Sequence, residues 1–234
     1  MSTAKRNAAI AALEMVEDGM VLGLGSGSTA EIFIELLGEQ VRQGLDVVGI
    51  PTSKGTAECA RENGIKLVDP DKVEAIHLTI DGADEIDENF QMIKGGGACL
   101  LREKIIADAS QHMVVIVDSS KMVKTLGRFP LPVEVDPFAV ALTVERIYDA
   151  LHQAGIKEVE TKIRPIKRGK KPLITDGGHY IVDCACGAIA DPMLTAALLN
   201  SVPGVMEHGL FINQAGTVIV GEKDHAQVME IVRE

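Results

Sequence analysis

Residues 20–30 read Met-Val-Leu-Gly-Leu-Gly-Ser-Gly-Ser-Thr-Ala and predict a buried strand, a glycine-rich turn and the start of a helix. The strand part is continuously apolar apart from glycine, which is typical of a strand covered on both faces. Gly25 and Gly27 let the backbone approach a ligand, and the first N–H groups of a helix favour an anion. Residues 29–43 carry apolar side chains at helical spacing. The stretch therefore predicts one β-α unit of an α/β protein.

The same alternation of strands and helices continues to about residue 127. Helical patterns occur at residues 3–17, 53–63 and 100–109, and strand-like apolar runs occur at 46–50, 65–68, 75–80 and 113–117. Apolar strands separated by helices predict a parallel sheet with helices on both faces.

The segment Pro130-Leu131-Pro132 interrupts this pattern, and a small α+β insert is expected after it. We expect strands at 133–135 and 159–163, a strand pair around Asp176-Gly177-Gly178, and helices at 139–154 and 192–199. From residue 205 the chain returns to strand-like runs at 210–212 and 217–220 and ends in a last helix, which we expect to rejoin the first sheet. The expected domains are therefore residues 1–129 with 205–234, and an insert over 130–204.

Composition and charge restrict the possible partners. Hydrophobic residues make up 46% of the chain and charged residues 24%, which is the range of a folded globular protein. The net charge of −11 and the 3% aromatic content disfavour nucleic acid and anionic membranes as partners. A phosphorylated ligand would need a local site of backbone N–H groups and a few lysines.

The location of the protein is expected to be cytoplasmic. Residues 1–20 contain acidic residues and no long apolar run, unlike a signal peptide, and no apolar run is long enough to span a membrane. The cysteines lack zinc-ligand spacing, so they are expected to be reduced thiols. The four are Cys59, Cys99, Cys184 and Cys186.

The turn at residues 23–30 has two interpretations. Its spacing nominally fits a dinucleotide fingerprint, but the next strand is followed by Pro51-Thr52-Ser53 and lacks the acid that holds a ribose. It also lacks the Gly-Lys-Ser/Thr of a nucleotide-hydrolysing loop. The turn either binds a phosphate or is a tight strand–helix connection with Ser28 or Thr29 as N-cap.

Asp81-Gly82-Ala83-Asp84-Glu85 directly follows an apolar strand. Ligands of open α/β sheets bind beyond the carboxyl ends of the strands, and neighbouring carboxylates shift each other's pKa. Asp81 and Asp84 are therefore candidates for acid–base chemistry or for holding hydroxyl groups. The alternatives are a solvated acidic turn or a metal site, although the run up to Glu88 does not fit the spacing of a calcium loop.

Lys94-Gly95-Gly96-Gly97 is the third candidate feature, with Glu103 in the first turns of the helix that follows. Successive glycine N–H groups can bind an oxyanion, and Lys94 adds positive charge. A flexible loop and an ordinary first-turn acid are the plain alternatives. Asp118-Ser119-Ser120-Lys121, beyond another strand end, is by itself best interpreted as a polar loop. Together, these groups at one sheet edge suit proton transfer beside the carbonyl of a phosphorylated polyol.

The strings GSGSTA, DGADE, IKGGGACLLREKI, DSSK and FPLPVEV, in this order, closely resemble the type A ribose-5-phosphate isomerase family. The resemblance covers essentially the whole chain. It implies a Rossmann-like domain with an inserted ferredoxin-like lid, a homodimer or homotetramer, and interconversion of ribose 5-phosphate and ribulose 5-phosphate in the pentose phosphate pathway. It implies no metal and no cofactor.

The resemblance also implies the roles of individual residues. Glu103 becomes the base that moves a proton through an enediolate, Asp81 assists ring opening, and Lys94 stabilises the developing charge. Lys5 matches a position that often helps to hold the phosphate. The implied substrate contacts are Ser26, Gly27, Ser28, Thr29, Asp81, Gly82, Ala83, Asp84, Lys94, Gly95, Gly96, Gly97 and Lys121.

Two positions depart from the family pattern, and two other functions compete. Ser26 stands where the family commonly has Thr, and Cys99 stands where it commonly has Ala, which could make the site sensitive to thiol reagents. A non-catalytic sugar-phosphate sensor could keep the phosphate turn and lose the base. An acyl-CoA transferase would need a nucleophilic glutamate and a larger site. An assay with ribose 5-phosphate separates all three.

Overall fold

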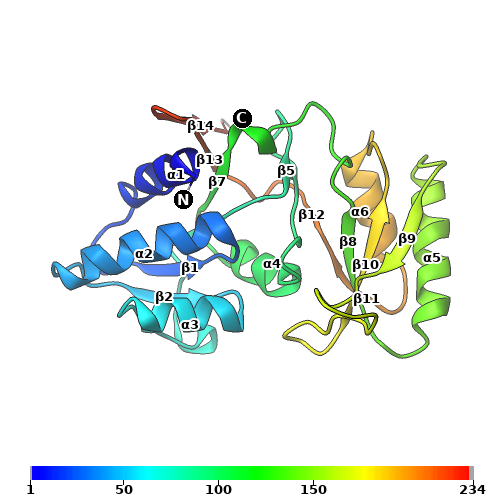
Figure 1. Cartoon of the computed structure of the whole chain (residues 1–234), viewed down its shortest axis with the longest axis horizontal. Coiled ribbons are helices and arrows are strands. Elements are labelled where there is room, and N and C mark those ends of the chain that lie inside the picture. The colour runs from blue at the N-terminus through cyan, green and yellow to red at the C-terminus, as the bar shows by residue number, and fades with distance from the viewer. Residues whose placement is uncertain (1, 232–234) are drawn as a thin grey trace. The chain divides into compact units, whose positions relative to one another are not determined.

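The computed structural model describes residues 2–231, and the chain divides into two compact units (Figure 1). Within the described chain, unit 1 comprises residues 2–83, 102–122 and 214–231. Unit 2 comprises residues 84–101 and 123–213. The domain boundaries expected at 129/130 and 204/205 stay a prediction.

Unit 1 contains a seven-stranded sheet in the order β14-β13-β7-β4-β1-β2-β3. All neighbours in it are parallel except β14, which is antiparallel to β13. The expected parallel sheet is thus confirmed. Its strands are β1 (Val21–Leu24), β2 (Val48–Pro51), β3 (Lys66–Leu67), β4 (Leu78–Asp81), β7 (Met113–Asp118), β13 (Thr217–Gly221) and β14 (Ala226–Glu230).

The strand order of this sheet reverses between β1 and β4. The chain runs outward from β1 to β2 and β3 and then returns to the other side of β1 as β4, with Leu24 beside Ile80 in the register. This is the Rossmann-like arrangement, in which the crevice beyond the carboxyl ends of the two central strands binds ligands. The turn after β1 and the end of β4 therefore occupy the position that the fold favours for chemistry.

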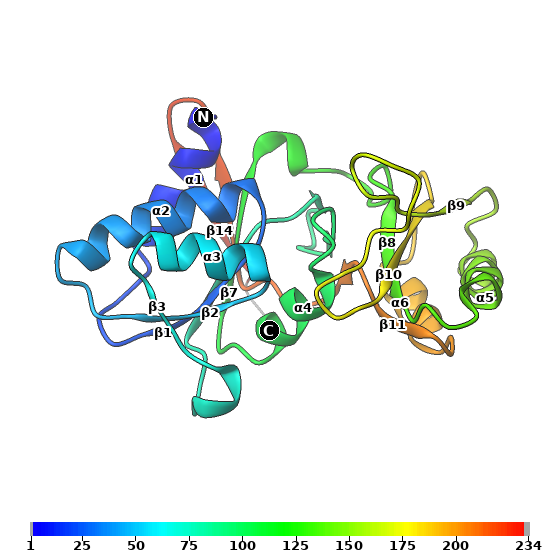
Figure 2. The same ribbon diagram turned by 60° about the horizontal axis from the view of Figure 1, so that its bottom comes forward.

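Helices cover both faces of the sheet in unit 1. Helices α1 (Thr3–Leu13), α2 (Ser28–Arg42) and α3 (Lys54–Glu62) lie on one side of β1, β2 and β3 (Figure 2). Leu22 and Leu24 of β1 join their apolar core. Gly23 faces the opposite way because side chains alternate along a strand. A Cβ on Gly23 would lie 2.7 Å from Ile106 Cγ2, so α4 (Leu100–Asp108) packs on the second face.

Unit 2 contains a four-stranded antiparallel sheet in the order β11-β8-β10-β9. The chain order β8-α5-β9-β10-α6-β11 is the ferredoxin-like arrangement. Val133, Ile147 and Leu199 belong to its apolar core. The elements are β8 (Leu131–Val135), α5 (Val140–Gln153), β9 (Glu160–Ile163), β10 (Tyr180–Ala185), α6 (Pro192–Asn200) and β11 (Val205–His208).

Unit 2 also contains a small three-stranded sheet in the order β12-β6-β5. Its strands pair antiparallel, and they fix the segment that carries Asp84 and Lys94. The strands are β5 (Glu85–Ile86), β6 (Met92–Ile93) and β12 (Leu210–Phe211), and the remaining short helices of the chain are η1 (Pro70–Lys72) and η2 (Ser119–Lys121), both in unit 1.

Three expectations about the second half of the chain are wrong. The last helix is the strand β14, which closes a hairpin with β13 through the turn at residues 222–225. The run at 210–212 forms β12, which pairs with β6 in a sheet of unit 2 instead of joining the first sheet. The turn at Asp176-Gly177-Gly178 exists, but the run before it bonds to residues 164–166, and β10 pairs with β9.

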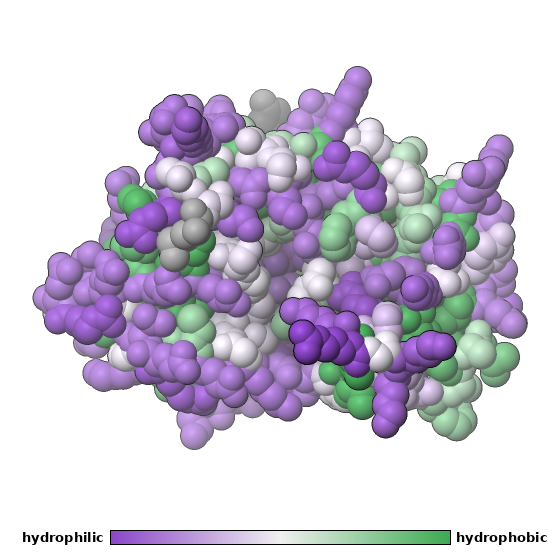
Figure 3. Space-filling view, in the orientation of Figure 1, coloured by the Kyte–Doolittle hydropathy of each residue, from purple (hydrophilic) through white to green (hydrophobic). Residues whose placement is uncertain are grey.

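The surface of unit 1 carries exposed acidic side chains, in agreement with the negative net charge of the chain. The outward side of α2 carries Glu31, Glu35 and Glu39, and hydrophilic side chains predominate over α2 in Figure 3. In the part of Figure 3 that shows unit 2, apolar and hydrophilic side chains are mixed. Across residues 2–231, no helix has the length and apolar character that crossing a membrane requires.

Candidate functional site

The turn between β1 and α2 leaves the helix N-terminus open. The N-cap is Gly27, with φ of 103°, and no side chain caps the helix. The alternative interpretation, with Ser28 or Thr29 as N-cap, does not hold, since α2 begins at Ser28. The first backbone N–H groups of a helix lack intrahelical acceptors, and the helix dipole adds positive potential there. This end of α2 can bind an anion.

Two side chains near this turn differ in what they contact. Lys5 Nζ, on α1, donates to Ser28 Oγ over 2.7 Å, which puts a cation at the N-terminus of α2. The hydroxyl of Ser26 instead bonds within the protein to three other hydroxyl groups at 2.8–2.9 Å. These belong to Thr52, Ser53 and Thr56, which sequence reasoning did not single out.

Asp81 is the fully buried last residue of β4. Its Oδ1 accepts the N–H groups of Ser26 at 3.1 Å and Gly82 at 2.7 Å. A Cβ on Gly25 would overlap this carboxylate, so only glycine fits there. The structure thus brings the first two sequence motifs together at the point where the strand order reverses. Ala83, half-buried, ends this segment of unit 1.

Glu103 lies in the first turn of α4 and is 4% exposed. It precedes Ile106 by three residues, so both side chains share the helix face that packs on Gly23. The helix leads into β7, which is parallel to β4, so its N-terminal turn lies at the carboxyl edge of the sheet. Glu103 is therefore a buried acid at the edge where Asp81 ends β4.

The glycine loop of unit 2 is more constrained than a flexible loop. Asp84 Oδ2 accepts the N–H of Gly96 at 2.7 Å, and the carbonyl of Gly95 accepts the N–H of Ala98 at 3.0 Å. Gly95 has φ of 105°, and a Cβ on Gly96 would lie 2.6 Å from Asp84 Oδ1. A Cβ on Gly97 would meet nothing closer than 3.9 Å. Two of the three glycines are thus required by geometry.

Lys94 is 2% exposed, although it is a lysine. Its backbone N–H donates to Gly209 O over 2.8 Å, and its Nζ lies 5.4 Å from the centre of the Phe211 ring. A cation over an aromatic face is stabilised by the ring quadrupole. Phe211 is thus another residue that the sequence did not point to.

Arg164 and Asp183 form an ion pair that the sequence analysis missed. The guanidinium contacts the carboxylate through Nε at 2.9 Å and through Nη2 at 2.5 Å. Its Nη1 donates to the carbonyl oxygens of Gly95 at 2.9 Å and Gly96 at 3.1 Å. An arginine far along the chain therefore supports the glycine loop, and no local sequence signal marks it.

The segment after β7 is a capped turn. Asp118 is the N-cap of η2 and accepts the N–H of Ser120 at 3.1 Å and its hydroxyl group. Lys121, half-buried, ends this turn beyond β7, which lies next to β4 in the sheet.

The acidic side chains that follow β4 do not converge on a common point. Glu85 is buried and accepts the N–H groups of Gly127 and Phe129, each at 2.7 Å. Asp87 Oδ1 accepts two N–H groups of its own loop, and burial raises its pKa. Among residues 2–231, no three His, Cys, Asp or Glu side chains gather in a way that could hold a metal ion.

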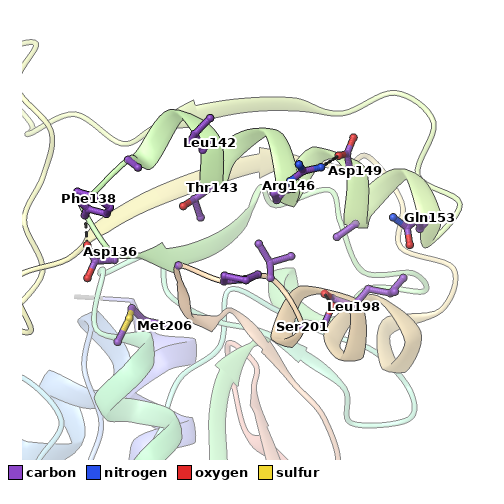
Figure 4. A pocket seen from close by; sticks show the side chains of 15 residues that line it. Asp136, Phe138, Leu142, Thr143, Arg146, Asp149, Gln153, Leu198, Ser201 and Met206 are labelled. Atoms are coloured by element: carbon purple, nitrogen blue, oxygen red, sulfur yellow. Dashed lines mark hydrogen bonds and ion pairs between the residues drawn. The ribbon is translucent and has the colours of Figure 1, made fainter.

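A cavity of about 920 Å³ in unit 2 contains none of the residues predicted for the site. It lies between α5 and the segment from α6 to β11 (Figure 4). Its walls include Phe138, Leu142 and Met206, which are exposed, and an ion pair between Arg146 and Asp149 at 3.2 Å. The lining of this cavity combines apolar and charged side chains, and it is distant in sequence from every acid–base candidate.

The fold and the site define a class of protein. It is a Rossmann-like α/β protein with an inserted ferredoxin-like domain, an open anion-binding helix end and buried carboxylates at the reversal of the strand order.

Comparison with known proteins gives the family. The family model for ribose 5-phosphate isomerase A (phosphoriboisomerase A) matches residues 48–225. The ribose-5-phosphate isomerase A of Maricaulis maris (strain MCS10) is 60% identical over 227 residues, 97% of each chain. The solved ribose 5-phosphate isomerase A of Methanocaldococcus jannaschii is 39% identical, with a TM-score of 0.89 over 97% of this chain and 98% of that one.

A second solved structure is similar to the chain to the same degree. It is a D-ribose-5-phosphate isomerase in complex with phospho-erythronic acid, 39% identical, with a TM-score of 0.90 over 97% of this chain and 98% of that one. The chain belongs to the ribose 5-phosphate isomerase A family, a family of isomerases. The expected fold, a Rossmann-like sheet with a ferredoxin-like insert, is confirmed.

Proposed function

We propose that the chain interconverts D-ribose 5-phosphate and D-ribulose 5-phosphate through an enediolate, as an enzyme of the pentose phosphate pathway. The observation that carries the proposal is the contact between Asp81 and the β1–α2 turn, which joins a buried acid to an anion-binding helix end. Membership of the isomerase family supports it.

The phosphate is assigned to the open end of α2. The phosphate oxygens would accept hydrogen bonds from the backbone N–H groups of Ser28 and Thr29. The hydroxyl groups of these two residues and the ammonium of Lys5 would lie beside them. Gly27 exposes its backbone there, and Ser26 contributes mainly by holding Asp81 through its N–H. Binding the distal phosphate fixes the reacting end of a small sugar, which lowers the entropic cost of the reaction.

Proton transfer is assigned to two carboxylates. Asp81 acts as acid and base in opening the sugar ring. Gly82 and Ala83, the next two residues of the chain, are assigned to substrate contact. Glu103 then removes the proton from C2 of the open aldehyde and returns it to C1, while the hydroxyl proton of O2 passes to O1. A carboxylate can serve both adjacent carbons with little movement, and the reaction needs no redox cofactor.

Stabilisation of the negative charge that develops on the substrate is assigned to Lys94 and the glycine loop. The ammonium of Lys94 and the N–H groups of Gly95 and Gly97 would stabilise the enediolate oxygens. Asp84 holds the loop through Gly96 and, with Lys121, orients the sugar hydroxyls.

The oligomer, the lid and the location are further parts of the proposal. We expect a homodimer or homotetramer in the cytoplasm, with residues 130–204 acting as a lid and with no nucleic acid or membrane partner. The exposed apolar side chains of Phe138, Leu142 and Met206 supply surface that association would bury. Light scattering that shows only a 25.0 kDa species at working concentration would contradict the oligomer.

A direct assay tests the function against its alternatives. Purified chain is incubated with ribose 5-phosphate, and in a second sample with ribulose 5-phosphate, and both sugars are followed by NMR. Both samples should reach the same equilibrium mixture. Binding without conversion would instead support the sugar-phosphate sensor, which is otherwise disfavoured by the family. Acyl transfer from a coenzyme A thioester would support the transferase.

A further inference from the structure

The side-chain nitrogens of Arg164 contact three residues of unit 2, namely Asp183, Gly95 and Gly96. Its side chain is 14% exposed. Nε and Nη2 contact the carboxylate of Asp183, and Nη1 donates to the carbonyl oxygens of Gly95 and Gly96. A guanidinium held in a fork by a carboxylate has a fixed plane, so the direction of Nη1 is also fixed.

These contacts determine where the neighbouring amides point. A carbonyl and the N–H of the next residue belong to one planar peptide unit and point in opposite directions when the peptide is trans. No cis peptide occurs among residues 2–231. Arg164 therefore directs the N–H groups of Gly96 and Gly97 away from itself. The Gly96 N–H meets Asp84 Oδ2 at 2.7 Å, so this peptide is held at both ends.

The glycine loop needs such support because of its composition. Three successive glycines have the largest backbone freedom of any sequence, and ordering them costs conformational entropy. An oxyanion site works only when its donors are oriented before the charge develops. A charged donor on the carbonyl also polarises the peptide and strengthens its N–H as a donor.

We propose that Arg164 is a positioning residue for the isomerisation, which orients and polarises the amide of Gly97 toward the oxygen that becomes negative in the enediolate. Asp183 sets the orientation of Arg164. The inference rests on the proposed function, because the isomerisation is what places an oxyanion at the loop.

The test compares Arg164→Met, which keeps the stem and removes the guanidinium, with Arg164→Lys, which keeps the charge and loses the fork. Arg146→Met is the matched control, because it removes an exposed arginine that also pairs with an aspartate in unit 2. Activity, folded fraction by circular dichroism, and binding of phospho-erythronic acid and inorganic phosphate are measured. The carboxylate of phospho-erythronic acid resembles the planar, charged end of the enediolate.

For Arg164→Met, kcat per folded molecule should fall about 10²-fold, the usual effect of one oxyanion donor. Affinity for phospho-erythronic acid should fall in parallel. KM and the affinity for inorganic phosphate should change less than about threefold, since other residues bind the phosphate. Arg164→Lys should lie between Arg164→Met and the wild type, and Arg146→Met should match the wild type.

Two results would overturn the role of Arg164. One is a wild-type kcat in a folded Arg164 variant. The other is an equal loss of affinity for both ligands, which indicates general disruption of the fold. If Arg164→Met does not fold, the same measurements of kcat and ligand affinity on Arg164→Lys decide whether Arg164 has this role. Turnover by the wild type tests the proposed function separately. If the wild type does not convert ribose 5-phosphate, the proposed function is wrong. If the wild type and the Arg164 variants turn over equally, only the role of Arg164 is wrong.

Discussion

Gly25 and Asp81 fit together only because Gly25 has no side chain. A Cβ on Gly25 would overlap the Asp81 carboxylate, and the Gly25 N–H donates to Ile80 O over 2.9 Å. The next N–H, of Ser26, reaches Asp81 Oδ1. The turn that ends β1 is therefore fixed against the end of β4. The anion-binding end of α2 and the buried acid depend on one close approach of backbone and side chain.

Gly25→Ala should damage activity and stability together. The added methyl must displace the Asp81 carboxylate or the turn, and overpacking of this kind costs about 1–3 kcal/mol. We expect a lower free energy of unfolding in urea and a kcat reduced by at least tenfold, because Asp81 leaves its hydrogen bonds.

Gly55→Ala is the matched control for Gly25→Ala. Gly55 lies in α3, and a Cβ there would meet nothing closer than Ser53 Oγ at 3.9 Å. Replacing a helical glycine by alanine should stabilise the protein by about 0.5–1 kcal/mol and leave kcat unchanged. Equal behaviour of the two variants would contradict the role given to the Gly25–Asp81 contact.

The parallel sheet and the helices were predictable because their signals are local. Apolar runs such as residues 113–117 and glycine turns such as 25–27 mark strands and their ends without knowledge of the partners. The last strand, β14, was mistaken for a helix because it is short, partly polar and defined by its pairing with β13. The run at 210–212 was expected in the wrong sheet for the same reason, since β12 is defined by its pairing with β6, far earlier in the chain.

The candidate site was predictable where its residues follow strands directly. Asp81 and the turn at residues 25–29 were expected at one sheet edge, and their hydrogen bond brings them together. Arg164 and Phe211 could not be found in this way. Each contacts the loop at residues 94–97 from a distant part of the chain, and neither belongs to a recognisable motif.

The phosphate assignment predicts a binding defect for Lys5→Met and Thr29→Ala. Removing a charged donor costs about 1.5–3 kcal/mol, so KM for ribose 5-phosphate should rise about 10- to 100-fold in Lys5→Met, with a smaller rise in Thr29→Ala. Lys66→Met, which removes an exposed lysine 3.8 Å from Asp46, should have no effect. Free ribose should be a very poor substrate, and efficient turnover of free ribose would disprove the assignment.

The cysteines should differ in reactivity toward iodoacetamide. Burial raises the pKa of Cys186 to about 12, so at pH 8 roughly one thiol in ten thousand is ionised there. Burial raises the pKa of Cys184 as well, so both should react only after unfolding.

Cys99 is the thiol whose alkylation should stop turnover. It is half-buried, and its Sγ lies 3.3 Å from Gly97 O, beside the glycine loop. Ribose 5-phosphate should protect it, and Cys99→Ala should be active and insensitive, whereas Cys59→Ala should remain sensitive. Peptide mass analysis identifies the modified residue, and inactivation of Cys99→Ala at the wild-type rate would refute this prediction.

Turnover should not depend on a metal ion. The proposed chemistry uses Lys94 and backbone amides for the charge that a metal would otherwise stabilise. Dialysis against a chelator should leave kcat unchanged. If chelation abolishes activity and a divalent ion restores it, the acidic run from Asp81 to Glu88 must be reinterpreted as a metal site.

Glu103→Gln is the test of the proposed base. Glutamine keeps the size and much of the hydrogen bonding of the buried glutamate but cannot accept a proton from C2. We expect kcat to fall about 10²- to 10⁴-fold, the usual contribution of a positioned general base, with little change in KM. Glu35→Gln, an exposed position on α2, should retain wild-type kcat.

Solvent deuterium gives a second measurement of the same step. During wild-type turnover in D₂O, deuterium should enter the product, because a proton held on a carboxyl group can exchange with water between removal from C2 and delivery to C1. Full retention of the C2 hydrogen would mean that a shielded Glu103 transfers the proton internally, so the rate of the variant decides its role. A folded Glu103→Gln with near-normal kcat would exclude Glu103 as the base, and the proton transfer would then have to be sought at Asp81, the other buried carboxylate at this edge of the sheet.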